Sequence, residues 1–178
     1  MRAGDVRLRP PVDEDRDARQ SLGVVADIAR MFGAENPLDG PMSSATATRW
    51  FRGLGAGGVI EWVVEVGGRF VGTARLHTID ADAGTVRYAV GFFDPSMLGR
   101  GIGRVVTELV CAHAFDVLRL REMSLTVLDF NERAQRCYSS VGFIEVSRMP
   151  SGVVVDSHRN ADDLVMTLTR DAWAVRNA

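Results

Sequence analysis

The chain has 178 residues, of which 46% are hydrophobic and 25% charged, proportions that suit one globular domain spanning residues 1–178. The formal net charge is −2, whereas proteins that bind nucleic acids are usually basic, so we expect no nucleic-acid partner. The two cysteines, Cys111 and Cys137, form no C-x-x-C pair, which argues against a disulfide framework and against a zinc site, and we expect no metal.

The N-terminal segment is charged and lacks the apolar stretch of a signal peptide. No uncharged apolar run of about 18 residues occurs, so we expect neither a membrane-spanning helix nor a membrane partner. The sequence therefore predicts a soluble, cytoplasmic protein.

The first third of the chain predicts one strand and two helices. Residues 6–10 alternate apolar and polar side chains, as a half-buried strand does. Residues 13–33 are interpreted as one helix, whose acidic first turn complements the helix dipole. A loop rich in Asn, Pro and Gly follows, and residues 45–55 predict a second helix, capped by Ser43 or Ser44.

Strand patterns dominate the middle of the chain. Residues 58–66 and 69–79 are two strand-like runs separated by Gly67-Gly68, a strong signal for a hairpin. A third strand, residues 85–93, precedes the helix predicted for residues 101–119.

The last third predicts a strand over residues 122–130 and a short helix over residues 131–141. Two final strands, residues 142–149 and 162–171, are separated by a polar loop. The complete order is β-α-α-β-β-β-α-β-α-β-β. It predicts an α/β (α+β) domain whose mixed, mostly antiparallel central sheet of about seven strands carries helices on both faces.

Residues 94–104, DPSMLGRGIGR, join a strand to a helix. A helix N-terminus has unpaired N–H groups and a partial positive charge, and glycines let a phosphate approach them. Arg100 and Arg104 add full charges, so the segment is interpreted as a diphosphate cradle, or alternatively as a tight turn with surface arginines. It lacks the lysine of a P-loop, and Arg104 stands where the dinucleotide fingerprint has its last glycine.

A second pattern, NERAQRCYSSVGF, covers residues 131–143. Asn131 suits a helix N-cap, and Gly142 suits the left-handed position just after a helix end. Tyr138 lies two turns after Asn131, hence on nearly the same face of the helix. Tyr138 is therefore either a residue that faces the same ligand as Asn131 or a core aromatic with a satisfied hydroxyl.

The glycine turn, the strand after it and the pattern N-x-x-A-x-x-x-Y-x-x-x-G-F together resemble the GNAT superfamily, the Gcn5-related N-acetyltransferases. The resemblance covers residues 6–170, because the order of elements also fits. The segment FDPSMLGRGIG is most similar to the branch typified by ribosomal-protein N-terminal alanine acetyltransferases. The resemblance implies the GNAT fold and transfer of an acetyl group from acetyl-CoA to a primary amine. The second motif is matched by Asn131, Ala134, Tyr138, Gly142 and Phe143.

In this family, the strands that match residues 85–93 and 122–130 splay apart, and the pantetheine arm of the coenzyme lies between them. By resemblance, the backbone of Gly91, Phe92 and Phe93 would bind the pantetheine amides. An N–H near Phe92 would also stabilise the oxyanion of the reacting carbonyl group.

The same resemblance implies roles for the second motif and the glycine turn. Asn131 would contact the pantetheine, and Tyr138 would lie near the sulfur and protonate the leaving thiolate as the general acid. The backbone of the turn would bind the pyrophosphate through Leu98, Gly99, Arg100, Gly101, Ile102, Gly103 and Arg104.

The strand before the glycine turn departs from the family pattern. Many members carry a glutamate there as the general base, and the matching position here is Arg87. An α-amine with a pKa near 8 is partly neutral at working pH and would need no base. Otherwise the candidate bases are Glu61, Glu65, His77 and Asp94.

The acceptor and the oligomeric state are left open by the sequence. The acceptor could be a protein N-terminal α-amine or a small-molecule amine. A non-catalytic sensor or scaffold that binds acyl-CoA with the same fold is the alternative function. The apolar alternation of residues 164–168 would permit a homodimer through the C-terminal strands, which is common in the family.

Overall fold

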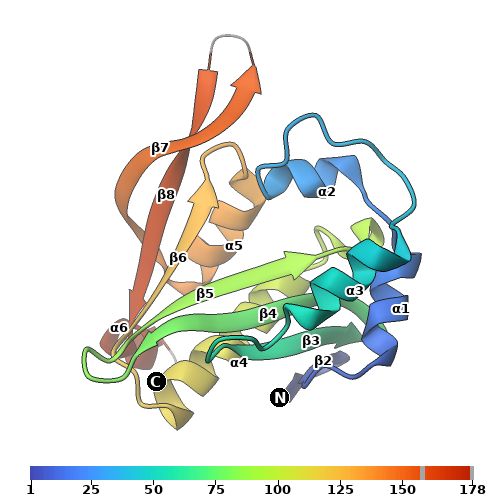
Figure 1. Cartoon of the computed structure of the whole chain (residues 1–178). Helices are drawn as coiled ribbons and strands as arrows, with labels where there is room; N and C mark the ends of the chain where they lie inside the picture. The colour runs from blue at the N-terminus through green and yellow to red at the C-terminus, as the bar shows by residue number, and fades with distance from the viewer. Residues whose placement is uncertain (157–158, 177–178) are drawn as a thin grey trace.

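The computed structural model describes residues 1–156 and 159–176, which form one mixed sheet with helices on both faces (Figure 1). Across the sheet the strand order is β1-β2-β3-β4-β5-β6-β8-β7, and only the β5–β6 pair is parallel among these described strands. This confirms the expected class. The strands are β1 (Arg2–Ala3), β2 (Val6–Arg9), β3 (Ile60–Val66), β4 (Arg69–Asp80), β5 (Thr85–Phe92), β6 (Glu122–Leu128), β7 (Ile144–Asp156) and β8 (Arg159–Thr169).

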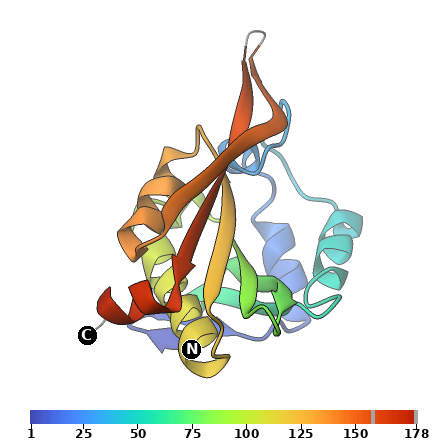
Figure 2. The ribbon, with the colours of Figure 1, turned by 90° about the vertical axis from the view of Figure 1, so that its left-hand side faces the viewer.

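Helices lie in two layers. In Figure 1, α1 and α3 cover the front face of the sheet, and α4 and α5 cover the rear face, as the view in Figure 2 also shows. A 3₁₀ turn, η1 (Pro95–Met97), precedes α4, and a π-helical turn, η2 (His113–Val117), follows it. The α-helices are α1 (Glu14–Ser21), α2 (Ala26–Met31), α3 (Ser44–Arg52), α4 (Ile102–Ala112), α5 (Glu132–Val141) and α6 (Arg170–Arg176).

The main core lies between the rear face of the sheet and helices α4 and α5. It contains alternate residues of β5, such as Val86 and Tyr88, and the apolar stripe of α4, such as Val106 and Val110, all of them buried. Because side chains alternate along a strand, the residues between those of β5 point to the front face. The two faces of β5 therefore have different neighbours.

Strands β5 and β6 pair only at their beginnings, where Thr85 to Arg87 lie opposite Glu122 to Ser124. Beyond that point β5 continues to pair with β4, and β6 continues to pair with β8 as far as Leu128. The two strands diverge and leave a wedge-shaped gap, the splay that the family resemblance implied (Figure 1).

Local signals in the sequence form the turns and caps that they predict. The Ser43 hydroxyl accepts a hydrogen bond from the Thr46 N–H at the start of α3. Gly67 and Gly68 have φ of +57° and +80°, as a type I′ hairpin requires. Gly142 ends α5 in the left-handed conformation.

The single helix expected over residues 13–33 is wrong. Gly23 lies between α1 and α2 with φ of +64°, and its neighbour Val24 forms an isolated β-bridge with Gly40. A Cβ atom on Gly23 would lie 2.7 Å from the Gly40 carbonyl oxygen. The β-bridge between Val24 and Gly40 interrupts the helix, and the spacing of apolar residues within 13–33 does not reveal a partner outside that segment.

The polar loop expected between the last two strands is also wrong. β7 and β8 pair as far as Asp156 and Arg159 and form a long hairpin that projects from the body (Figure 2). The register shifts at three places along β7, so this stretch lacks the regular alternation that identifies a strand. The helix expected over residues 101–119 ends as an α-helix at Ala112, and the short elements β1 and α6 were not expected.

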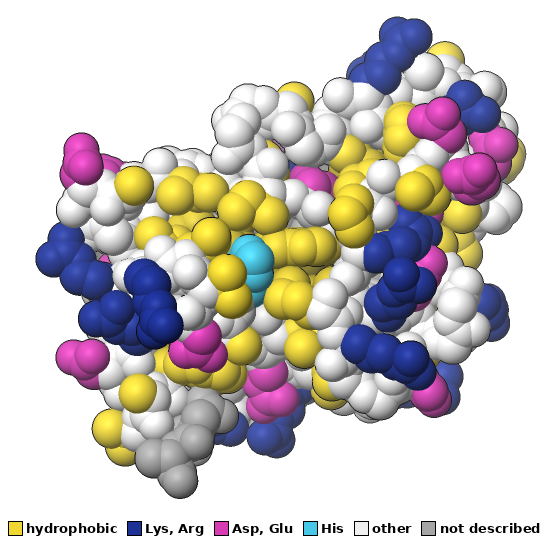
Figure 3. All heavy atoms as spheres, turned by 90° about the horizontal axis from the view of Figure 1, so that it is seen from below, with side chains coloured by type: hydrophobic (Ala, Val, Ile, Leu, Met, Phe, Trp, Pro, Cys, Tyr) yellow, Lys and Arg dark blue, Asp and Glu magenta, His cyan; other side chains and the backbone are white. Residues whose placement is uncertain are grey.

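Charged and apolar side chains are unevenly distributed over the surface. Seen from below, the molecule has hydrophobic side chains over the middle of the face, with arginine and acidic side chains mostly toward its margin (Figure 3). Within residues 1–156 and 159–176, no helix combines the length and apolar character that crossing a bilayer requires. The same residues contain no group of three or more side chains placed to hold a metal ion.

Candidate active site

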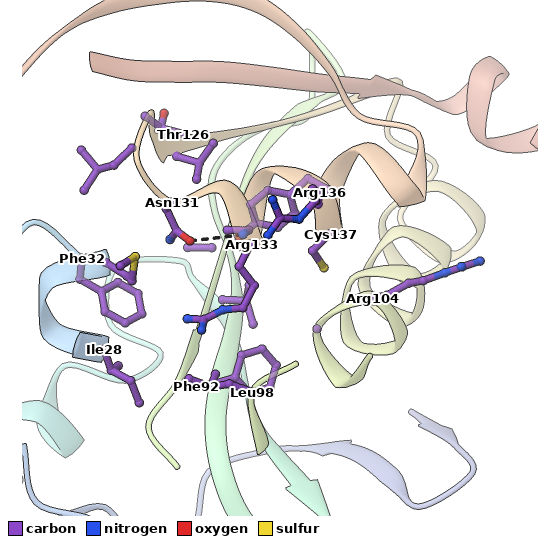
Figure 4. Close-up of a pocket in the computed structure, with 18 of the residues that line it drawn as sticks. Ile28, Phe32, Phe92, Leu98, Arg104, Thr126, Asn131, Arg133, Arg136 and Cys137 are labelled. Atoms are coloured by element: carbon purple, nitrogen blue, oxygen red, sulfur yellow. Dashed lines mark hydrogen bonds between the residues drawn. The ribbon is translucent and has the colours of Figure 1, made fainter. Parts of the chain in front are cut away.

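The gap between β5 and β6 opens into a pocket of about 610 Å³ (Figure 4). Helix α2 forms one side, α5 and the start of α4 form others, and residues of the β7–β8 hairpin complete it. The residues expected at the site that do line it are Phe92, Leu98, Gly99, Gly101, Ile102, Gly103, Arg104, Asn131 and Tyr138. Gly91, Phe93 and Arg100 are not among the lining residues.

The turn before α4 presents free backbone donors to the pocket. Gly99 and Gly101 have φ of +72° and +76°, a conformation that side-chain-bearing residues rarely adopt. A Cβ atom at either position would meet nothing within 4 Å, so the space in front of this backbone is open. Gly101 is the N-cap of α4, and no side chain of the described residues caps the helix, which leaves the first N–H groups free for an anion.

Gly103 is required for a different reason. It lies inside the helix with ordinary geometry, and a Cβ atom there would lie 3.2 Å from the Cys137 Sγ and 3.6 Å from the Phe92 ring. The glycine therefore lets α4 approach α5 closely. The backbone is open to a ligand at Gly99 and Gly101, so the prediction that glycines make room for a phosphate now rests on these two positions.

Of Phe92 and Phe93 at the end of β5, one offers its backbone donor to the gap. The Phe93 N–H donates to the Val71 carbonyl oxygen at 2.8 Å, so it is engaged with β4, and the Phe93 ring stacks on Phe70. Donors alternate between the two sides of an antiparallel strand, so the Phe92 N–H points toward the gap. Of the two phenylalanines, only Phe92 lines the pocket.

Helix α2 closes the pocket on the side opposite α4. Phe32, just after α2, and Ile28 point toward the pocket (Figure 4). A Cβ atom on Gly91 would lie 3.1 Å from the Phe32 ring, so Gly91 makes room for this aromatic side chain. Gly91 thereby shapes the pocket without lining it.

Tyr138 forms part of the rear wall. Its ring packs edge-on against Tyr88, with centroids 6.3 Å apart, and is 8% exposed. The Tyr138 hydroxyl has no hydrogen-bond partner among the described residues, whereas the Tyr88 hydroxyl lies 3.1 Å from the Thr107 hydroxyl. Burial raises the pKa of Tyr138 well above its ordinary value, so the phenol keeps its proton at neutral pH.

Asn131 both caps α5 and lines the pocket. Its side-chain oxygen accepts a hydrogen bond from the Ala134 N–H at 3.2 Å, drawn as the dashed line in Figure 4. The side-chain amide nitrogen, for which the described residues supply no acceptor, remains available to a ligand.

Sequence reasoning missed two arginines at the mouth of the pocket. Arg133 and Arg136, in the first turns of α5, line it together with Arg104 (Figure 4). Arg104 pairs with Glu108, and Arg136 pairs with Glu132, whereas Arg133 has no ion pair within the described residues. Exposed arginines in a helix are ordinary surface residues in a sequence, so only the position of α5 distinguishes them.

Two of the four candidate bases are engaged elsewhere. The Glu65 carboxylate pairs with Arg9 at 2.6 Å. The Asp94 carboxylate is buried and accepts hydrogen bonds from the Ser96 N–H and hydroxyl, and it also contacts Arg69. Both carboxylates therefore stabilise the fold.

Glu61 and His77 lie on the front face of the sheet, outside the pocket lining. Glu61 is 9% exposed, and one of its oxygens has no hydrogen-bond partner in the part of the chain that the structure describes. Burial raises the pKa of its carboxyl group. Burial, followed by the charges of Arg75 and Arg87, lowers the pKa of His77, so its imidazole is neutral at pH 7. Either group can accept a proton.

Asp163 was not expected at the site. It lies on β8, is half-buried, and is the acidic side chain among the described residues that line the pocket. It has no ion pair among the described residues. The residues around Asp163 in the sequence do not identify it as a site residue, because its position at the pocket depends on β8 lying beside the splayed part of β6.

A family model described as "Acetyltransferase (GNAT) domain" matches residues 5–144. The chain belongs to the GNAT acetyltransferase family. The matched region includes the glycine turn, the gap between β5 and β6, and helix α5. Membership of the ribosomal-protein alanine acetyltransferase branch stays a prediction.

Solved structures with the GNAT fold cover nearly the whole chain. The spermidine N-acetyltransferase from Vibrio cholerae, in complex with CoA and spermine, has a TM-score of 0.78 at 18% identity, and 96% of this chain and 98% of that chain are covered. A protein from T. thermophilus, provisionally assigned as an acetyltransferase, has a TM-score of 0.81 at 18% identity, with 98% and 91% covered. At this identity the likeness shows that the fold is shared.

GNAT acetyltransferases use acetyl-CoA, and the pocket fits both ends of this co-substrate. The uncapped start of α4 and the unpaired Arg133 suit the diphosphate. The Phe92 N–H, the Asn131 amide and the Tyr138 hydroxyl lie farther along the same pocket and can meet the pantetheine and the sulfur.

Proposed function

We propose that this protein transfers the acetyl group of acetyl-CoA to a primary amine by direct attack while both substrates are bound. The observation that carries the proposal is one continuous pocket, with free helix N–H groups at one end and, in its wall, a phenol unpartnered within the described residues. The acceptor would be a protein N-terminal α-amine or a small-molecule amine. The GNAT neighbours include an enzyme that acetylates spermidine, which supports an amine as the acceptor.

Each side chain has a role that follows from its position. Acetyl-CoA supplies an acetyl group activated as a thioester. The backbone of residues 99–104, excluding Arg100, holds the diphosphate, and Arg133 adds a positive charge. The Leu98 N–H is engaged with the Pro95 carbonyl oxygen at 3.2 Å, so Leu98 lines the pocket without a free donor. The Phe92 N–H stabilises negative charge that develops on the carbonyl oxygen. The amine enters from the front face, and where it needs a proton acceptor the candidates are Glu61 and His77 on that face and Asp163 in the pocket wall.

Tyr138 is the proposed general acid. Its raised pKa keeps the hydroxyl protonated, and the hydroxyl has no competing partner in the described protein, so its proton is available to the departing sulfur. Tyr88 is the natural comparison, because it is also a buried phenol in the pocket, but its hydroxyl is bonded to Thr107.

The test is release of CoA from acetyl-CoA with a panel of amines, measured for wild type, Tyr138→Phe and Tyr88→Phe. We expect Tyr138→Phe to lower kcat by about 10²–10⁴-fold with unchanged acetyl-CoA binding. Tyr88→Phe should change kcat only a few-fold and cost about 1 kcal/mol of stability. If wild type binds acetyl-CoA tightly but releases no CoA with any amine of the panel, the alternative of a non-catalytic acyl-CoA-binding module replaces the proposal.

A homodimer stays a prediction. β7 is an edge strand of the sheet and exposes Ile144 and Val146, which pairing of two copies would bury. Sedimentation of the purified protein measures this state directly.

A further inference from the structure

Two arginines on the front face of the sheet lie next to the pocket without a charged partner. Arg75 on β4 and Arg87 on β5 are exposed, and neither has an ion pair among the described residues. Arg75 lies directly opposite Ala89, which lines the pocket. Arg87 donates a hydrogen bond to the Thr126 hydroxyl across the gap, at 2.6 Å, and Thr126 also lines the pocket.

The two guanidinium groups come from neighbouring positions. Arg87 is two residues before Ala89, so Arg75 and Arg87 are diagonal neighbours on one face, with Cα atoms about 7 Å apart. Helices α1 and α3 leave this end of the front face uncovered, near the β4–β5 turn (Figure 1). Two exposed guanidinium groups at neighbouring positions beside a pocket provide a surface that can bind an anionic group of a ligand.

The acidic groups on this face do not neutralise the pair. Glu61 lies opposite Arg75 on β3 but is buried, and no ion pair joins them. Burial raises the pKa of the Glu61 carboxyl group, and the charge of Arg75 offsets this only in part. Glu122 lies on β6 one step nearer the closed end of the gap, opposite Thr85. Burial first, and then the charges of Arg75 and Arg87, lower the pKa of His77, which agrees with a positive potential at this surface.

The opposite wall of the pocket carries the Asp163 carboxylate. Asp163 pairs with Leu128, two residues beyond Thr126 on the neighbouring strand, so it lies about 7 Å along and about 5 Å across from Thr126. An acceptor with a carboxylate and an ammonium group separated by one or two carbon atoms can therefore contact the arginine pair and Asp163 together.

We propose that the acceptor is a small amine that carries a carboxylate beside its amino group, as an amino acid does, and that Arg75 and Arg87 hold this carboxylate. The inference rests on the proposed acetyltransferase function and narrows its acceptor. Guanidinium groups bind carboxylates through paired hydrogen bonds, whereas a polyamine would be repelled by this surface. The position that carries a glutamate in many GNAT members thus carries an acceptor-binding arginine here.

The test compares matched acceptors: the common amino acids and their amides, together with spermidine, at saturating acetyl-CoA. An amide has a less basic amine and would react faster at neutral pH if the carboxylate were irrelevant. We expect at least one amino acid to be acetylated with a kcat/KM at least about 10-fold above that of its amide.

The double variant R75Q/R87Q should remove this preference by raising KM for the amino acid about 10- to 100-fold, while acetyl-CoA binding is unchanged. Arg52→Gln, which removes an exposed arginine from α3, serves as the matched control and should leave the preference intact. Circular dichroism and thermal melting confirm that the variants fold.

The outcomes separate the two proposals. Turnover of spermidine or of amides at rates equal to or above those of amino acids would overturn the inference and leave the acetyltransferase function standing. Absence of turnover with every amine would overturn the function itself.

Discussion

Arginines on the same face of the sheet differ in whether they have carboxylate partners: Arg9 forms one group with its partners, and Arg75 and Arg87 form the second. Arg9 on β2 donates to Asp15 of α1 through both terminal nitrogens, at 2.6 and 2.8 Å, and through Nε to Glu65 of β3 at 2.6 Å. Arg75 and Arg87 lie farther along the face and have no carboxylate partner within the described residues.

The difference separates fold from function. Helix α1 covers Arg9, and the hydrogen bonds between Arg9 and Asp15 hold this helix against the sheet. The hydrogen bonds to Asp15 and Glu65 also raise the pKa of Arg9 further. The second group lies beside the pocket, and its guanidinium groups are open to solvent. Arg9 is therefore a structural arginine, whereas Arg75 and Arg87 form the proposed site for the carboxylate of the acceptor.

Asp15→Asn should break the structural group and have the largest effect on stability. Asp15 has a side chain 2% exposed, and removal of its charge leaves the half-buried Arg9 guanidinium with Glu65 as its remaining close carboxylate partner. We expect a loss of about 3 kcal/mol in the free energy of unfolding, measured by urea denaturation. The control is Asp17→Asn, an exposed partner of Arg16, which should change the free energy of unfolding far less, because solvent screens this pair. Equal effects would show that the Arg9 group is no more structural than a surface pair.

Ala89→Asp should give Arg75 a carboxylate partner, as Arg9 has in Asp15. The new carboxylate would lie opposite Arg75 and compete with the acceptor for it. We expect KM for a carboxylate-bearing acceptor to rise about 10-fold, with little change in stability. Ala89→Asn, which has nearly the same shape and no charge, should have a smaller effect; a matching rise in KM would attribute the change to size.

Glu61→Gln should have the smallest effect, and the effect depends on pH. Burial raises the pKa of Glu61 from 4.5, so the folded protein binds this proton more tightly than the unfolded chain does. The contribution of Glu61 to stability is complete below the ordinary pKa and is lost as pH rises through the raised one. We expect the wild-type stability to fall more steeply than that of the variant as pH rises from 4 to 8, measured by urea denaturation at each pH. Parallel stability curves for the two proteins would contradict the shift.

Much of the fold and part of the site could be predicted from short stretches of sequence. The Ser43 cap, the Gly67-Gly68 hairpin and the left-handed Gly142 depend on backbone preferences of the residues themselves, which no distant contact needs to supply. The glycine turn before α4 is of the same kind, because free N–H groups and positive φ are local properties.

The remaining features depend on residues far apart in the chain. Gly23 ends α1 because its neighbour pairs with Gly40, and the Phe93 N–H is engaged because Val71 lies beside it. Tertiary structure alone places Asp163 beside the pocket, since β8 inserts between β6 and β7.

The sequence by itself determined the family, the order of the elements and the turn that offers donors to an anion, because these follow from local conformation and motif spacing. Only the tertiary structure decided which glycine makes room for a helix and which arginines lack a partner. Those properties are set by the register between strands, and a strand pattern does not encode which strand lies beside it.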